Sequence, residues 1–258
     1  MSGTPLKIII IIAAVLYYAS FAAYLAEKRH KAFGAVSKTA WGAAWLLNLG
    51  TVINNYCVNG YVPFVSMFQV LTFLAMCFGP ILIYMAFARR SGWMRPYFIS
   101  AAAIVMTGLC FMDADAHWEY PPALQSPWFV PHVLVYMIAY SMGLVCFLIA
   151  VSALVTKDKE RKKRLDAGVY DCVCVVFPFM TFGLFFGAIW ANEIWGAFWS
   201  WDNKECWSLV TWLTYMLCLH FRRHRSLAKY ADLLAVTGFI CIIVTFFFVR
   251  GGSHSYSM

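Results

Sequence analysis

The sequence predicts an all-α polytopic membrane protein of about eight transmembrane helices, with both termini outside the cytoplasm. Three observations lead to this prediction. Of the 258 residues, 62% are hydrophobic and only 12% are charged, whereas a soluble domain carries about 25% charged residues. The hydrophobic residues fall into long runs separated by short polar or basic connections. The basic residues lie mostly in alternate connections, which is typical of a multi-pass membrane protein.

The first four candidate spans are residues 5–25, 38–58, 68–88 and 97–112. We interpret the first as a permanent helix and not as a signal peptide, because no positive charge precedes it and no small-residue cleavage site follows it. The second is expected to face protein more than lipid, because polar side chains are costly in lipid and this span holds Asn48, Asn54 and Asn55, with Asn59 directly after it. The fourth is short for a span of about 20 residues.

The last four candidate spans are residues 129–155, 169–191, 206–221 and 232–250. The first of these is long enough for its N-terminal residues to project beyond the lipid. The chain contains no low-complexity stretch and no convincing internal repeat. We therefore expect residues 1–258 to form a single transmembrane domain.

Charge sets the predicted orientation of these helices. Of the 20 Lys and Arg residues, 17 lie in the segments 26–38, 89–96, 156–165 and 222–229. The positive-inside rule places these segments in the cytoplasm. The net charge of +8 is then explained by topology, so no nucleic-acid partner is predicted. The nine cysteines include no Cys-x-x-Cys pair, and neither a disulfide framework nor a zinc site is expected.

Tryptophan is concentrated in residues 190–207, which hold five of the 11 tryptophans of the chain. An aromatic belt at the lipid headgroups explains one or two tryptophans at a helix end, but less easily five in one segment. Trp195 and Trp199 share a face if the segment is helical. The alternative to a belt is a platform for a large flat ligand, since indoles supply apolar area and a polar N–H edge. Composition and spacing leave both interpretations open.

Two histidines lie near this segment on the predicted outer side. His132 stands at the outer start of a span, and His254 follows two glycines in the C-terminal tail. Each alone is more often an interfacial hydrogen-bonding residue. Together, two neutral imidazoles on opposite sides of an apolar shelf are suited to axial ligation of haem iron. Lys204 and Arg250 are candidate partners for haem propionates, although Arg250 is equally explained as a helix-end residue that reaches the interface.

His220 differs from these two histidines. It lies 13 residues after Trp207 on the same apolar run, and therefore about 20 Å deeper. An ionisable residue within a span is a candidate functional residue. The alternative is a boundary histidine beside the basic residues that follow it.

The segment WGAFWSWDNKE, from Trp195 to Glu205, resembles the WGxxWxWD signature of haem-handling membrane proteins, which here comprises Trp195, Gly196, Trp199, Trp201 and Asp202. The residues that follow, including Trp207, Thr211 and Trp212, resemble the CcsA (ResC) branch. Similarity extends to Ser126-Pro127-Trp128 through His132, to Leu219-His220 and to Gly252-x-His254. It covers the C-terminal half well and the first half only by topology.

The resemblance implies a membrane subunit of the System II cytochrome c synthase in a bacterial cytoplasmic membrane. Such a subunit exports haem b, holds it outside and presents it for thioether attachment to the Cys-x-x-Cys-His motif of apocytochrome c. Carried over by motif, His132 and His254 are the axial ligands and His220 is the intramembrane histidine. Haem lyase activity is expected only together with a CcsB (ResB)-like membrane subunit, and no residue here must be the base.

The sequence also departs from the family pattern. Asn203 stands where Pro is usual, Cys206 where Thr is frequent, and Gln69 near a common Glu. The first change is expected to loosen the turn after Asp202, and the last puts a polar role for that position in doubt. Two alternative functions stay open at this point, a haem transporter without catalysis and a b-type electron-transfer subunit.

Overall fold

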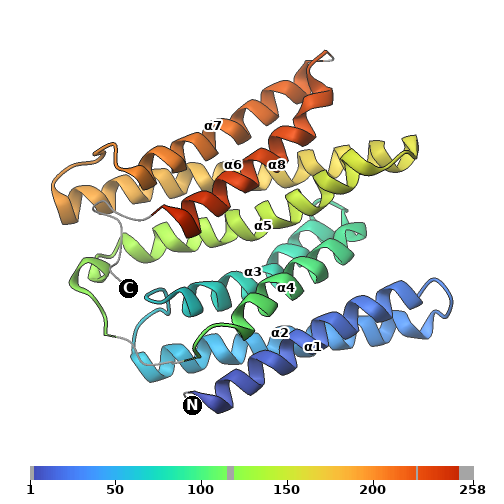
Figure 1. Ribbon diagram of the computed structural model, residues 1–258, viewed down its shortest axis with the longest axis horizontal. Helices are drawn as coiled ribbons and strands as arrows, with labels where there is room; N and C mark the ends of the chain where they lie inside the picture. The colour runs from blue at the N-terminus through green and yellow to red at the C-terminus, as the bar shows by residue number, and fades with distance from the viewer. Residues whose placement is uncertain (1–2, 115–118, 225, 250–258) are drawn as a thin grey trace. The chain divides into compact units, whose positions relative to one another are not determined.

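The computed structural model describes residues 3–114, 119–224 and 226–249. Within these ranges the regular structure is entirely helical, as predicted (Figure 1). The chain divides into two compact units, Met1–Pro121 (unit 1) and Pro122–Met258 (unit 2). Five of the helices are long and apolar enough to cross a membrane, namely α1, α3, α5, α6 and α8 with its flanking turns. Helices of this kind are those of a multi-pass membrane protein.

Unit 1 contains four helices, and each is a neighbour of the next. α1 spans Thr4–Ala26, α2 Ala32–Asn59, α3 Met67–Phe87 and α4 Arg95–Cys110, preceded by a short 3-10 turn at Gly92–Met94. α1 also packs against α4, which closes the group. The Trp45 indole donates to the carbonyl of Met76 at 2.8 Å, and the Asn48 amide donates to the carbonyl of Thr72 at 3.0 Å. These two bonds fix α2 and α3 as antiparallel neighbours.

The asparagines of α2 face protein in part, as the sequence indicated. Asn48 and Asn55 are fully buried. Gln69, near the position of the common Glu, caps α3: its side chain accepts from the backbone N–H of Ser66, and its own N–H donates to the Ser66 hydroxyl. The capping box gives this glutamine a structural role.

Unit 2 repeats the same neighbour order. α5 spans Phe129–Val155, α6 Lys159–Trp195, α7 Asn203–Arg223 and α8 Ala231–Ile243, which continues into a π-helical turn at Val244–Phe248. Consecutive helices are neighbours, and α5 packs against α8. Short 3-10 turns at Pro122–Gln125 and Ala228–Tyr230 lead into α5 and α8.

The prediction for the sixth helix was wrong at its start. α6 begins at Lys159 rather than at residue 169, so most of the basic segment 156–165 is helical. Asp158 caps the helix by accepting hydrogen bonds from the backbone N–H groups of Glu160 and Arg161. Lys, Arg and Glu are good helix formers. A charged sequence therefore continues the helix beyond the apolar stretch.

Candidate functional site

The tryptophan-rich segment connects α6 to α7 at one end of unit 2. Trp195 is the last residue of α6, and Gly196 ends the helix in the left-handed conformation, with φ of 77°. Its N–H donates to the carbonyl of Asn192 at 3.0 Å. Glycine adopts this conformation without the steric cost that a side chain imposes. The Gly196 of the signature therefore turns the chain so that residues 197–202 form a loop outside the helix.

Two carboxylates build the turn that follows. Asp202 is the N-cap of α7 and accepts a hydrogen bond from the N–H of Glu205 at 2.8 Å. The buried carboxylate of Glu205 accepts from the N–H and the hydroxyl of Ser200, at 2.8 and 3.2 Å, and from the N–H of Asp202 at 3.3 Å. This is a capping box. Asp202, predicted to bind the cofactor, is therefore engaged in holding the loop, and Asn203 in place of Pro leaves the turn intact.

The tryptophan side chains of the loop differ in exposure. Trp201 has a φ of 59°, which is costly for a residue with a side chain, and it is 70% exposed. Its ring lies edge-on to that of Trp199, with centroids 5.7 Å apart. The Trp199 Nε1–H is buried and has no acceptor among the described residues. A buried donor without an acceptor is unfavourable, so this indole fits a ligand that carries hydrogen-bond acceptors at its edge.

His132 lies in the first turn of α5, and α6 fixes its ring. Its Nδ1 is 2.9 Å from the carbonyl oxygen of Gly183. A carbonyl only accepts hydrogen bonds, so Nδ1 carries the proton in the neutral ring. The lone pair then belongs to Nε2. A backbone carbonyl on one nitrogen and a metal on the other is the common arrangement of histidine ligands.

Aromatic rings surround this histidine. Trp190 stacks on the imidazole with centroids 5.6 Å apart, and Tyr136 meets it edge-on at 5.0 Å. Trp190 is anchored by donating from Nε1 to the carbonyl of Ala123 at 2.9 Å. Trp195 meets the Trp190 ring edge-on at 4.9 Å. A continuous series of rings thus joins the end of α6 to His132.

Two glycines of α6 make room for rings of α5, one for the imidazole of His132 and one for Tyr136, and the sequence analysis missed them. A Cβ on Gly187 would lie 2.6 Å from Cε1 of His132, and one on Gly183 would lie 2.7 Å from the ring of Tyr136. α5 and α6 approach each other closely because α6 lacks side chains at these two positions. The signal was present in the sequence as Gly183-x-x-x-Gly187, a spacing found where transmembrane helices pack closely.

Ser126 couples the start of α5 to the end of α6. Its hydroxyl donates to the carboxylate of Glu193 at 2.7 Å and accepts from the N–H of Trp128 at 3.2 Å. The Ser126-Pro127-Trp128 sequence is therefore part of the same end of unit 2. It holds the chain immediately before His132.

The other predicted site residues divide into three groups. Trp207 lies one turn into α7 and is half-exposed, while Lys204 is partly buried in the first turn. Burial lowers the pKa of Lys204, and the Asp202 carboxylate opposes this. His220 lies in the last turn of α7, exposed, with Nδ1 2.8 Å from the carbonyl of Met216 in its own helix. His254 and Arg250 lie outside the described residues.

His220 and His132 are not brought together. His220 lies 17 positions after Asn203 on α7, and therefore about 25 Å from the connection that carries the tryptophans. Two facing histidines of a b-type cytochrome are therefore absent from the described part of unit 2.

Comparison with known proteins identifies the family. The model of the family described as "Cytochrome C assembly protein" matches residues 7–254. The chain belongs to this family. The protein named "Cytochrome c biogenesis protein CcsA" from Chlamydomonas reinhardtii is 30% identical over 241 residues, which are 86% of this chain and 68% of that protein. Its namesake from Trieres chinensis is 27% identical over 296 residues, covering 96% and 94% of the two chains.

A CcsA protein from Prochlorococcus marinus is 28% identical over 246 residues, or 78% of each chain. The cytochrome c assembly family is thus matched across both units, and the resemblance to the CcsA branch is confirmed. No solved structure matches the chain.

Proposed function

We propose that this protein acts in cytochrome c maturation by holding haem b at the tryptophan-rich end of unit 2 and presenting it for covalent attachment. Membership of the cytochrome c assembly family supports a role in cytochrome c maturation. The arrangement of His132 supports the proposed haem site at this end of unit 2. An imidazole whose Nδ1–H is held by the Gly183 carbonyl at 2.9 Å directs its basic nitrogen to a metal.

The surrounding side chains suit a flat amphiphilic substrate. Trp195 is 37% exposed and offers ring surface at the end of α6, while the buried Trp190 packs against both Trp195 and the imidazole. Aromatic rings stack well on extended π systems. Trp199 offers a buried N–H, and Trp201 an exposed indole. Lys204 and Arg250 are the proposed partners of the propionates, and His254 the second axial ligand. Trp207 extends the indole surface along α7.

The proposed chemistry adds each cysteine thiol of a Cys-x-x-Cys-His motif across one haem vinyl group. One C–S bond forms per vinyl, and the thiol hydrogen ends on the neighbouring vinyl carbon, so no external oxidant is required. The thiolate is the stronger nucleophile. The contribution of this chain is positioning: it fixes one edge of the substrate, and the acceptor peptide meets the other. The acceptor histidine then replaces His132 or His254 on the iron.

The proposed setting is a bacterial cytoplasmic membrane with the tryptophan-rich end outside. A CcsB (ResB)-like membrane subunit completes the synthase, and apocytochrome c is the acceptor. His220 is proposed as an intramembrane contact for haem on its way outward, which fits its exposure on α7. The basic connections support this orientation by the positive-inside rule.

The test is coexpression of the chain with a CcsB-like subunit and an apocytochrome c. Haem staining of the acceptor measures attachment, and the Soret band of the purified complex measures binding. We expect His132→Ala to reduce attachment at least about tenfold and to shift or remove the Soret band, and His254→Ala to do the same. His30→Ala, an exposed substitution in unit 1, is the matched control and should retain both signals.

Two results would contradict the proposal. If His132→Ala leaves the Soret band and the attachment yield unchanged, His132 is not a ligand. If haem copurifies with the wild-type complex and no covalent product forms with any acceptor, the chain is a haem transporter.

A further inference from the structure

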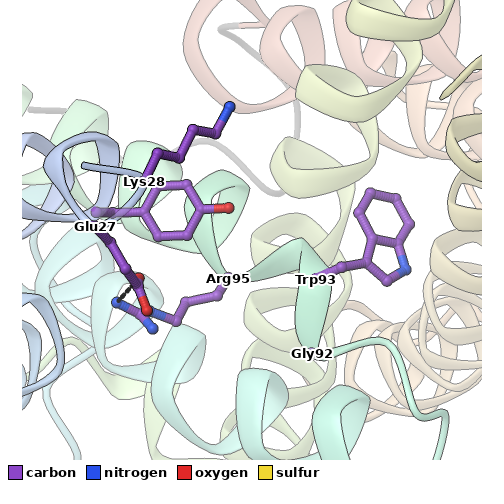
Figure 2. A pocket seen from close by; sticks show the side chains of 6 residues that line it. Glu27, Lys28, Gly92, Trp93 and Arg95 are labelled. Carbon is purple, nitrogen blue, oxygen red and sulfur yellow. Dashed lines mark ion pairs between the residues drawn. The ribbon is translucent and has the colours of Figure 1, made fainter. Parts of the chain in front are cut away.

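A pocket of about 330 Å³ lies in unit 1, where the end of α1 meets the start of α4. Figure 2 shows its lining, which consists of Tyr24, Glu27, Lys28, Gly92, Trp93 and Arg95. All its residues belong to unit 1, whereas the tryptophan-rich segment belongs to unit 2. It lies at the end of unit 1 that carries the basic segments 26–38 and 89–96.

The guanidinium of Arg95 is the central group of this pocket. It lies over the ring of Tyr24, 5.3 Å from the centroid, and donates from one terminal nitrogen to the hydroxyl of Ser37. Its Nε–H is buried and has no acceptor among the described residues. Arginine carries five N–H donors in a planar fork that matches phosphate and carboxylate oxygens. The side chain is therefore held in place with donor capacity to spare.

Glu27 balances only part of the positive charge. Its carboxylate lies 3.9 Å from the Arg95 guanidinium, which is longer than a charge-assisted hydrogen bond of about 2.8 Å. Lys28 adds a second cation to the same lining. The first turn of α4, whose N-terminal end bears partial positive charge, follows the 3-10 turn Gly92–Met94. The pocket thus has an excess of positive charge.

We propose that this pocket binds the phosphate headgroup of an anionic membrane lipid. Basic pockets between transmembrane helices on the cytoplasmic side are suited to such headgroups. Leu25, which follows the lining residue Tyr24 in sequence, is 54% exposed and offers apolar surface for an acyl chain. A porphyrin fits less well, because Figure 2 shows the Trp93 indole turned away from the Arg95 guanidinium. The rings of Tyr24 and Trp93 therefore do not form one shelf.

The experiment measures lipid retained by the purified full chain. Native mass spectrometry in detergent compares added phosphatidylglycerol with phosphatidylcholine. We expect selective retention of phosphatidylglycerol by the wild-type chain. Lys28→Gln should weaken it about fivefold, because a basic side chain near the surface contributes about that factor. Glu27→Gln should strengthen it, because the competing carboxylate is lost. Arg29→Gln removes the same charge outside the pocket and is the matched control.

Three outcomes would overturn the proposal. These are equal retention of the two lipids, weaker retention by Glu27→Gln, and a loss in Arg29→Gln as large as in Lys28→Gln. Haemin that displaces phosphatidylglycerol competitively would assign the pocket to the porphyrin instead. Arg95→Gln is a stronger variant, but Arg95 also contacts Ser37 and Tyr24. If that variant fails to fold, Lys28→Gln and Glu27→Gln still test the proposed lipid binding. None of these results depends on haem attachment, so the proposed function is tested separately.

Discussion

The imidazole of His132 is oriented by the backbone of a neighbouring helix. The carbonyl of Gly183 fixes the tautomer, and the missing side chain of Gly187 gives the ring its place. Neither feature is a property of the histidine itself. Single-residue substitutions on α6 should therefore change the orientation of the His132 imidazole on α5.

The first residue-scale prediction concerns Gly187→Ala. Its Cβ would meet the His132 ring at 2.6 Å, so the ring must move, and we expect a loss of about 1–3 kcal/mol in the free energy of unfolding. Haem absorbance should fall as well. Gly50→Ala on α2 has no atom within 4 Å of the added Cβ and should be neutral or stabilising. Thermal unfolding in detergent and the Soret band measure both effects. Equal behaviour of the two variants would contradict the steric explanation.

The second residue-scale prediction separates binding from stability at Trp201. Trp201→Gly removes the cost of a φ of 59°, so we expect the melting temperature to be unchanged or higher, with about 1 kcal/mol of strain relieved. Haem binding should fall, because an indole that is 70% exposed is lost. Phe198→Gly in the same loop is the control; it removes no positive φ and should not stabilise. Retained haem affinity in Trp201→Gly would show that this indole is not a contact.

At the scale of the helices, one buried carboxylate joins three elements of unit 2. Asp232 at the start of α8 is 2% exposed. It accepts from Arg222 of α7 at 2.6 Å and from Lys162 of α6 at 3.2 Å. Lys162 also reaches the carbonyl of Ala153 on α5 at 3.2 Å. Basic residues that the sequence analysis predicts to be cytoplasmic therefore fasten the helix ends opposite the tryptophan-rich connection.

The helix-scale prediction follows from this network. Asp232→Asn removes the carboxylate that pairs with Arg222 and leaves Lys162 with Asp166 alone, so we expect a loss of about 3–5 kcal/mol in the free energy of unfolding. Asp166→Asn removes the second, more exposed carboxylate partner of Lys162 and should cost less than about 1 kcal/mol. Thermal denaturation of the two variants in the same detergent compares them. Similar losses would argue against a special role for Asp232.

The sequence identified the elements more reliably than their ends. Apolar runs located all eight helices, but the start of α6 at Lys159 was missed, since hydropathy does not report the helix propensity of a charged run. At the site, the tryptophan signature located the loop and His132. It did not reveal that Gly183 binds the imidazole, because this contact joins residues that only packing brings together. It also missed that Glu205 folds the loop, although the spacing Asp202-x-x-Glu205 is that of a capping box.

For the whole molecule, the two units share one neighbour order, in which consecutive helices are adjacent and the first contacts the last. The predicted single domain of residues 1–258 stays a prediction, as does the placement of both termini outside. Orientation determines which end of each unit meets the cytoplasm. It is also the property on which the lipid pocket and the haem site both depend.

The whole-molecule prediction tests this orientation with a native cysteine. Cys57 is exposed near the end of α2 and is expected outside. A membrane-impermeant maleimide should label it in intact cells, and Cys57→Ser should lose that label. Lys157→Cys, introduced into a Cys57→Ser and Cys206→Ser background, should react only after permeabilisation. The opposite pattern would invert the predicted topology.

The length of α6 has a mechanical consequence. Its 37 residues make a rod of about 55 Å, whereas the hydrocarbon core of a bilayer is about 30 Å thick. Several turns must therefore stand in water, and the charged residues that begin the rod mark which turns these are. A protein that bound these turns would contact the same helix that carries the Gly183 carbonyl, with Pro178 between the two. A tilt of α6 would then move the carbonyl that orients the His132 imidazole.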